Sequence, residues 1–214
     1  MKPTATLRGL YLVTPDWDDT ARLLDVTRAA LEGGVALLQY RHKTASPELR
    51  RTQAAALLAL CREFGCPFIV NDHVELALAL DADGVHVGGT DAAVAAVRDQ
   101  VGPDKIVGAS CYGDLALAQA AHAAGASYVA YGGFYPSRVK KYPVTTEVGV
   151  LAASHSSVPL PSVVIGGMTV ENSRVLIAAG ADMVAAISSV YSSADATAAA
   201  AAFTALYARQ DRAA

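Results

Sequence analysis

The stretch ALLQYRHK, residues 36–43, runs from a short apolar segment directly into an arginine and a lysine. Three further apolar segments end in polar residues, namely Asn71-Asp72, Ser110 and the run Pro136-Ser-Arg-Val-Lys-Lys141. Cations, carboxylates and hydroxyls therefore gather at the carboxyl ends of predicted strands. An eight-stranded α/β barrel keeps its active site at that edge, so this shared position favours such a barrel.

Apolar runs rich in Val, Ile and Tyr alternate with helical segments throughout, and many are too uniformly apolar for an exposed antiparallel sheet. The predicted strands are Leu10–Thr14, Ala36–Tyr40, Pro67–Asn71, Gly84–Val87, Ile106–Ser110, Tyr128–Tyr131, Ser162–Ile165 and Met183–Ile187. The predicted helices are Thr20–Glu32, Pro47–Phe64, Val74–Leu80, Ala92–Val101, Leu115–Ala124, Thr146–Ser154, Val170–Ala179 and Ala196–Ala208. This alternation predicts a single (β/α)8 barrel, a TIM barrel of class α/β, over residues 1–214.

A doubly wound open sheet is the alternative, but no G-x-G-x-x-G follows the first predicted strand. The 214 residues lie near the low end for a complete barrel. Hydrophobic residues make up 53% and charged residues 17%, which is typical of a folded domain. The net charge of −3 and pI near 5.9 provide no broad basic field, so we expect no nucleic-acid partner.

The three cysteines form no C-x-x-C pair, which favours a reduced, cytoplasmic compartment. Residues 1–9 lack the apolar core of a secretory signal, and no apolar stretch is long enough to span a bilayer. We therefore expect no membrane association. A homo-oligomer remains open.

Gln39, Arg41 and Lys43 are spaced by two, which places them on one side of an extended strand. Inward-facing cations are costly unless they meet an anion. The trio therefore favours an anion site, the alternative being a solvated basic loop.

Asp72 and Asp91 follow the third and fourth predicted strands. Two carboxylates, completed by waters and phosphate oxygens, are a typical Mg²⁺ environment. The alternative is helix capping, because each precedes a predicted helix. Both roles can coexist.

His86 and Ser110 each have two interpretations. His86 lies inside an apolar strand, where it is either a hydrogen-bonded core residue or part of the site. Ser110 has no G-x-S-x-G elbow, so we expect a hydroxyl that donates to phosphate, or one that caps a turn.

Three loops complete the candidate site. The basic loop at Pro136–Lys141 is either a flap over phosphates or a solvated loop. The runs Ile165-Gly-Gly-Met168 and Ala186-Ile-Ser-Ser189 follow the seventh and eighth predicted strands, where barrels often bind a phosphate. Glycine lets backbone N–H groups approach an anion closely. The residues thus predict a large, metal-assisted anion site and a second site for one phosphate.

Taken together, the motifs resemble the thiamine phosphate synthase family over nearly the whole chain. They are YLVT from Tyr11, LQYRHK from Leu38, FIVND from Phe68, ADGVHVG from Ala82, GASCY from Gly108, YVAYGGFYPS from Tyr128, VIGGM from Val164 and GADMVAAIS from Gly180. The family joins 4-amino-2-methyl-5-hydroxymethylpyrimidine diphosphate to a thiazole phosphate. Pyrophosphate leaves first, and CO2 is released where the thiazole is carboxylated.

The resemblance implies a role for each matching residue. Arg41, Lys43, Asn71, Ser110 and Lys140 would hold the diphosphate, with Ser137 nearby, and Asp72 and Asp91 would bind Mg²⁺. Gln39, Tyr11 and His86 would address the pyrimidine, and Gly167, Ile187 and Ser188 the thiazole phosphate. Arg41, Lys43, Ser110 and Lys140 would also be the catalytic groups that stabilise the leaving pyrophosphate.

The chain departs from the family in two motifs. The family commonly has Gln where this chain has Gly89, and its flap usually reads P-T-x-T-K, where this chain reads Pro136-Ser-Arg-Val-Lys140, so that Ser137 keeps a hydroxyl and Val139 loses one. A thiazole tautomerase of the same fold is the nearest rival, but its relatives tend to lose the Asn-Asp pair that this chain keeps at residues 71–72. Another phosphate-handling barrel, such as a sugar phosphate isomerase, or a silent thiamine-phosphate-binding barrel are further alternatives.

Overall fold

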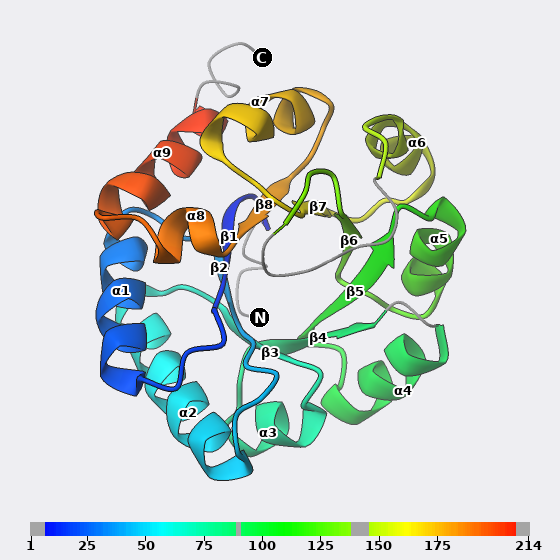
Figure 1. Ribbon diagram of the computed structural model, residues 1–214. Coiled ribbons are helices and arrows are strands. Elements are labelled where there is room, and N and C mark those ends of the chain that lie inside the picture. The colour runs from blue at the N-terminus through cyan, green and yellow to red at the C-terminus, as the bar shows by residue number, and fades with distance from the viewer. Residues whose placement is uncertain (1–6, 89–90, 138–145, 209–214) are drawn as a thin grey trace.

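Eight parallel strands close into a barrel in which each strand pairs with the next and β8 pairs with β1 (Figure 1). The computed structural model describes residues 7–88, 91–137 and 146–208, except for the side chains of residues 91 and 92. The strands are β1 (Gly9–Val13), β2 (Leu37–Tyr40), β3 (Phe68–Asn71), β4 (Gly84–Gly88), β5 (Ile106–Tyr112), β6 (Tyr128–Gly132), β7 (Ser162–Ile165) and β8 (Met183–Ala186). The predicted TIM barrel is confirmed.

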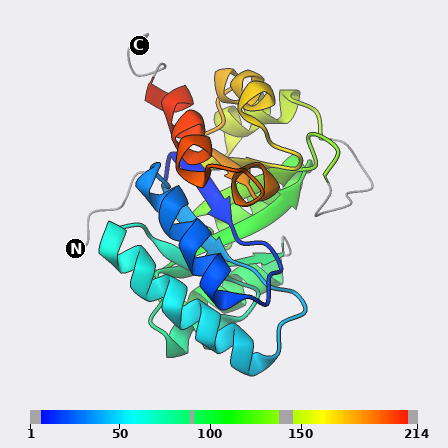
Figure 2. The ribbon, with the colours of Figure 1, turned by 60° about the vertical axis from the view of Figure 1, so that its left-hand side comes forward.

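Helices form a ring around the strands, as Figures 1 and 2 show from two directions. They are α1 (Thr20–Glu32), α2 (Pro47–Phe64), α3 (Val74–Ala79), α4 (Asp91–Val101), α5 (Leu115–Ala123), α6 (Gly149–Ser157), α7 (Val170–Ala178), α8 (Ser188–Tyr191) and α9 (Ala196–Ala208). The short α8 was not predicted, and it directly follows β8. None of the described helices is long and apolar enough to cross a membrane.

The longest helix has the sequence signals that favour its two ends. Ser46 is the N-cap of α2, where its hydroxyl accepts a hydrogen bond from the Leu49 N–H at 3.2 Å, and Pro47 opens the helix. Gly65 ends the helix at φ +63°, a left-handed conformation that glycine adopts without steric cost.

The sixth helix starts later than the sequence indicates. We predicted a start at Thr146, but α6 begins at Gly149. Thr146 is buried instead, and its hydroxyl donates to the Gly132 carbonyl at 2.6 Å while its N–H donates to the Gly133 carbonyl at 2.9 Å. These bonds tie the end of the β6–α6 connection to the carboxyl end of β6, so Thr146 cannot join the helix.

Alternating side chains along the strands contribute to two separate cores. On β1, Leu10 and Leu12 belong to the large cluster that includes helical residues such as Leu57. Tyr11 and Val13, between them in sequence, belong to a second cluster made almost entirely of strand residues. The barrel interior is therefore a packed core, and the polar groups within it lie close beneath the site.

Candidate active site

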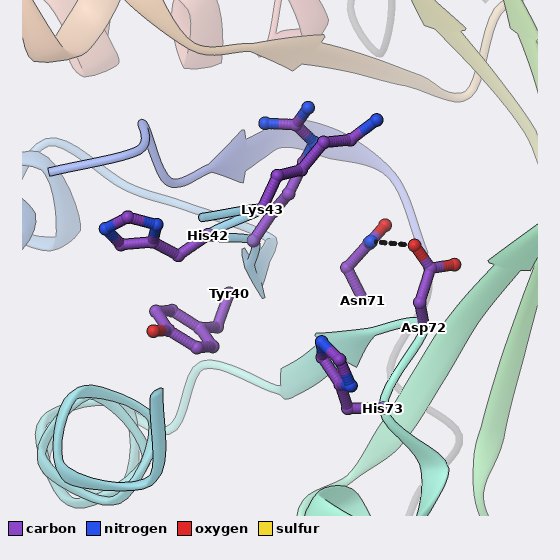
Figure 3. Close-up of a pocket in the computed structure, with 7 residues that line it drawn as sticks. Tyr40, His42, Lys43, Asn71, Asp72 and His73 are labelled. Atoms are coloured by element: carbon purple, nitrogen blue, oxygen red, sulfur yellow. Dashed lines mark hydrogen bonds between the residues drawn. The ribbon is translucent and has the colours of Figure 1, made fainter. Parts of the chain in front are cut away.

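A pocket of about 270 Å³ opens where β2 and β3 end (Figure 3). Its lining residues come from two consecutive segments, namely Tyr40, Arg41, His42, Lys43, Asn71, Asp72 and His73. Figure 3 shows the side chains of Lys43, Asn71 and Asp72 extending to the same side, while the His42 ring points away from them. The structure therefore brings the predicted basic stretch and the Asn-Asp pair to one cavity.

Arg41 is almost fully buried, and its charge meets a carboxylate of the protein. One terminal nitrogen of the guanidinium donates to both oxygens of Asp16 at 3.2 and 3.3 Å. The same carboxylate accepts a hydrogen bond from the Lys43 backbone N–H at 2.8 Å. The inference that a buried Arg41 requires an external anion was therefore too strong, because Asp16 already compensates its charge. Lys43 is exposed.

Asp16 is a residue that sequence reasoning missed. It lies in the connection between β1 and α1, three residues after the end of β1. The signal was available, because a carboxylate just past a barrel strand follows the same rule that identified Asp72. A second carboxylate of this loop, Asp18, lies 3.0 Å from Nε2 of the buried His42. Asp16 and Asp18 of the β1–α1 loop thus both contact the segment that follows β2.

Asp72 lies at the rim of the pocket with its side chain exposed. Its backbone adopts φ +61°, uncommon for a residue with a side chain, and its N–H donates to the His86 carbonyl at 2.9 Å. The Asn71 amide donates to the Asp72 carboxylate at 2.6 Å. The N-cap of α3 is His73, so the capping interpretation of Asp72 is wrong.

An exposed carboxylate at a strand end is chemically suited to Mg²⁺, which prefers oxygen ligands and often binds through only one or two carboxylates. Asp91 is the first residue of α4, directly beyond β4, the neighbour of β3. The structure does not describe the side chain of Asp91. Among the residues that it does describe, no group of three His, Cys, Asp or Glu residues could hold a metal. The two-carboxylate metal site stays a prediction that Asp72 fits.

A continuous chain of hydrogen bonds crosses the barrel interior beneath the rim. Gln39 Nε2 donates to Tyr11 Oη at 2.5 Å, and Tyr11 Oη lies 2.7 Å from Tyr128 Oη. Tyr128 Oη lies 2.8 Å from His86 Nδ1, and His86 Nε2 lies 2.8 Å from Ser110 Oγ. The chain joins β2, β1, β6, β4 and β5, and a small hollow at its edge is lined by four of its five members.

The hydrogen-bond chain answers the question that the sequence left open for His86 and adds a partner for Ser110. His86 is a hydrogen-bonded core residue and also contacts Ser110, so its two interpretations are compatible. Ser110 is part-exposed at the outer end of the chain. Burial raises the pKa of both Tyr11 and Tyr128, so both phenols remain protonated near neutral pH. Sequence reasoning missed Tyr128, because it is indistinguishable from its apolar neighbours in a buried strand.

The opposite side of the barrel mouth is built from backbone. Gly166 and Gly167 follow β7 with φ values of +113° and +60°. A Cβ on Gly167 would overlap the Pro136 carbonyl, and the Asn172 amide donates to the Gly167 carbonyl at 2.9 Å. The loops after β6 and β7 are therefore in contact, which brings the start of the predicted flap toward the predicted phosphate site.

The remaining predicted residues are placed as follows. Ile187 is buried at the N-cap of α8, one residue after β8, and Ser188 is exposed at the start of α8. Ser137 is part-exposed in the loop after β6. Lys140 and the departure at Val139 lie outside the described residues, as does the departure at Gly89.

Comparisons with known proteins agree on one family. The sequence profile described as thiamine monophosphate synthase matches residues 10–190. A thiamine-phosphate synthase of Janthinobacterium sp. (strain Marseille) is 64% identical over 205 residues, covering 96% of this chain and 99% of that protein. The thiamine-phosphate synthase of Methylobacillus flagellatus is 49% identical, covering 88% and 90%. A solved thiamine phosphate pyrophosphorylase from Pyrococcus furiosus superposes with a TM-score of 0.83 at 31% identity, covering 96% and 98%.

Proposed function

The chain belongs to the thiamine monophosphate synthase family, and on that premise we propose which parts of its barrel mouth carry out the reaction. The enzyme joins 4-amino-2-methyl-5-hydroxymethylpyrimidine diphosphate to a thiazole phosphate, giving thiamine phosphate and pyrophosphate. CO2 is also lost where the thiazole is carboxylated. The observation that carries the assignment is the pocket in which Arg41, Lys43, Asn71 and Asp72 converge on one cavity.

The diphosphate binds in this pocket. A diphosphate carries several negative charges, and Arg41 and Lys43 offer it charged N–H donors from the lining of the pocket. Asp16 orients the guanidinium through one terminal nitrogen, so other N–H groups of the fork can face the ligand. The Asn71 amide, Ser110 hydroxyl, Ser137 hydroxyl and Lys140 amine complete the set of donors. Lys140 enters on the resemblance alone.

The reaction begins when the C–O bond between the pyrimidine methylene and the diphosphate breaks. The electron pair leaves with pyrophosphate, and the resulting cation is stabilised by the aminopyrimidine ring. The thiazole nitrogen then donates its lone pair to form the new C–N bond. Arg41, Lys43 and Lys140 stabilise the charge that develops on the leaving group, which is why no protein nucleophile is needed.

Mg²⁺ would be held by Asp72 and Asp91, and when bound it neutralises charge on the pyrophosphate. The Asn71 amide keeps the Asp72 carboxylate oriented through its 2.6 Å hydrogen bond. Gln39, Tyr11 and His86 contact the pyrimidine from the floor of the mouth, where a small hollow is lined by all three.

The thiazole phosphate binds on the opposite side, at Gly167, Ile187 and Ser188. This assignment is supported by the left-handed conformation of Gly167 and by its position after β7, where TIM barrels often bind phosphate. We also propose a cytoplasmic location, supported by three cysteines that are all buried free thiols.

The test is pyrophosphate release from the pyrimidine diphosphate, measured with and without thiazole phosphate, in Mg²⁺ and in chelator. Release that needs both substrates and the metal, with thiamine phosphate as product, supports the proposal. Interconversion of thiazole tautomers without release would assign the chain to the tautomerase alternative. Binding of thiamine phosphate without any turnover would assign it to the binding-barrel alternative.

A further inference from the structure

Tyr128 lies at the centre of the hydrogen-bond chain in the barrel interior, and the proposed mechanism gives it no role. Its ring stacks on His86 with an interplanar angle of 17°, and it meets the Tyr11 ring edge-on at 90°. A Cβ at Gly108 on β5 would overlap the end of the Tyr128 side chain. The neighbouring strand therefore carries a glycine where this phenol needs room.

The donor and the acceptor of each bond in the hydrogen-bond chain follow from the partners that each group has. Gln39 Nε2 can only donate, so Tyr11 Oη accepts from it. The proton of Tyr11 then needs an acceptor, and within the described residues its one other partner is Tyr128 Oη. Tyr11 is buried, and a buried donor without an acceptor is costly. Tyr11 therefore donates to Tyr128.

The same reasoning assigns the hydrogen bonds from Tyr128 to Ser110, at the rim of the barrel mouth. Tyr128 Oη accepts from Tyr11, so its own proton is donated to its second partner, His86 Nδ1. An Nδ1 that accepts carries no proton, so the neutral imidazole has its proton on Nε2. His86 Nε2–H then donates to Ser110 Oγ. The Ser110 hydroxyl proton is thereby left to donate away from the chain, toward the mouth.

We propose that Tyr128 is a positioning residue that sets the His86 tautomer, so that the Ser110 hydroxyl donates to the departing diphosphate. This inference rests on the proposed function for the identity of the acceptor. If the chain ran in the opposite direction, Ser110 would donate to His86 and could offer the diphosphate only lone pairs, which an anion repels. The chain also links the two ends of one substrate, because Gln39 addresses the pyrimidine and Ser110 the diphosphate.

Tyr128→Phe tests this role, and Tyr131→Phe is its matched control. Tyr131 lies on the same strand, is equally buried, and loses a hydroxyl that donates to Ser154 Oγ at 2.7 Å. Its side chain belongs to the large cluster that includes Leu10 and Leu57, and not to the cluster that contains Tyr128. The two variants therefore remove the same atom from the same strand on opposite faces.

The first readout is the nitrogen NMR spectrum of imidazole-labelled protein without substrate, with the His86 signal assigned by its loss in His86→Gln. We expect the Nε2–H tautomer in the wild type and in Tyr131→Phe, and a mixture of tautomers in Tyr128→Phe. A wild-type signal of the Nδ1–H tautomer would overturn the proposal, whatever the enzyme's activity.

The second readout is steady-state pyrophosphate release. Tyr128→Phe should lower kcat by about tenfold to a hundredfold, the range expected when a donor to the transition state is misoriented, with little change in KM for thiazole phosphate. Tyr131→Phe should keep its kcat. Normal kcat in folded Tyr128→Phe would overturn the proposal. Absence of release by the wild type would instead refute the proposed function, and the NMR result would still decide the direction of the chain.

Discussion

The two sides of the barrel mouth differ in what forms their surface, which is side chains on one side and backbone on the other. Around β2 and β3, charged and amide side chains face a cavity and are held by other side chains, as Arg41 is held by Asp16. After β7, the shape comes from backbone, with Gly166 and Gly167 in conformations that other residues rarely adopt. If the proposed sites are right, the first side recognises its ligand through charged side chains and the second through the shape of its backbone, so substitutions on the two sides should fail in different ways.

The largest effect is expected from Arg41→Ala, which removes a cation from the pocket proposed to hold the leaving group. We predict a loss in kcat/KM of about a thousandfold, at the upper end for one transition-state contact. KM for thiazole phosphate should change little, because Arg41 lies on the other side of the mouth. Arg28→Ala is the control, since Arg28 forms its 2.8 Å ion pair with Glu63 on the helical surface. Equal weakening of both substrates would contradict the placement of Arg41.

Gly167→Val should have the next largest effect, because a side chain would overlap the Pro136 carbonyl and would strain a left-handed backbone at φ +60°. We expect KM for thiazole phosphate to rise by about thirtyfold, or about 2 kcal/mol of binding free energy. Gly65→Val is matched in backbone, at φ +63°, but meets nothing within 4 Å. If both variants lost stability equally and KM did not change, Gly167 would be a structural glycine only.

Asp16→Ala should weaken diphosphate binding in the pocket at β2 and β3, but less than Arg41→Ala does. The carboxylate that orients Arg41 and accepts from the Lys43 N–H is lost, while both cations remain. We predict about a tenfold higher KM for the pyrimidine diphosphate, the order expected for a lost charged hydrogen bond. Asp16→Asn, which keeps an acceptor oxygen, should be intermediate. Tighter diphosphate binding by the alanine variant would show that Asp16 competes with the substrate instead of orienting Arg41.

The smallest effect concerns Glu171, in the first turn of α7 beside the glycine loop. A hydrogen bond with its own backbone, followed by one with the Thr169 hydroxyl, lowers the pKa of this carboxyl. Its stabilising contribution is therefore present above the usual carboxyl pKa and is lost as pH falls through the lowered value. Glu171→Gln should lower Tm at pH 7 by only about 1 °C and reduce the drop in Tm on acidification. An unchanged acid-induced drop would disprove this contribution.

The architecture could be predicted because its signals are local. Buried parallel strands leave continuous apolar runs, and Ser46-Pro47 and Gly65 mark the ends of α2 within a few residues. The predicted start of α6 was wrong because the Thr146 hydroxyl donates a hydrogen bond to the carbonyl of Gly132, fourteen residues earlier. The short α8 has no sequence signal of its own, since its four residues follow β8 almost directly.

The site was predictable where chemistry stands at a strand end, and less so where it depends on long-range partners. Tyr11 and Tyr128 meet across 117 residues, and no spacing rule connects them. Asp16 lies in a loop and acts through Arg41, 25 residues away. The strand-end rule could have proposed Asp16 as a candidate, but its pairing with Arg41 is visible only in the fold.

The most direct test of the two-sided mouth is calorimetric titration of pyrophosphate and of thiazole phosphate, in Mg²⁺, into the wild type, Arg41→Ala and Gly167→Val. We predict that Arg41→Ala loses affinity for pyrophosphate and keeps it for thiazole phosphate, and that Gly167→Val does the reverse. If each variant weakens both ligands to the same extent, the two phosphate groups share one site and the division of the mouth into two halves is wrong.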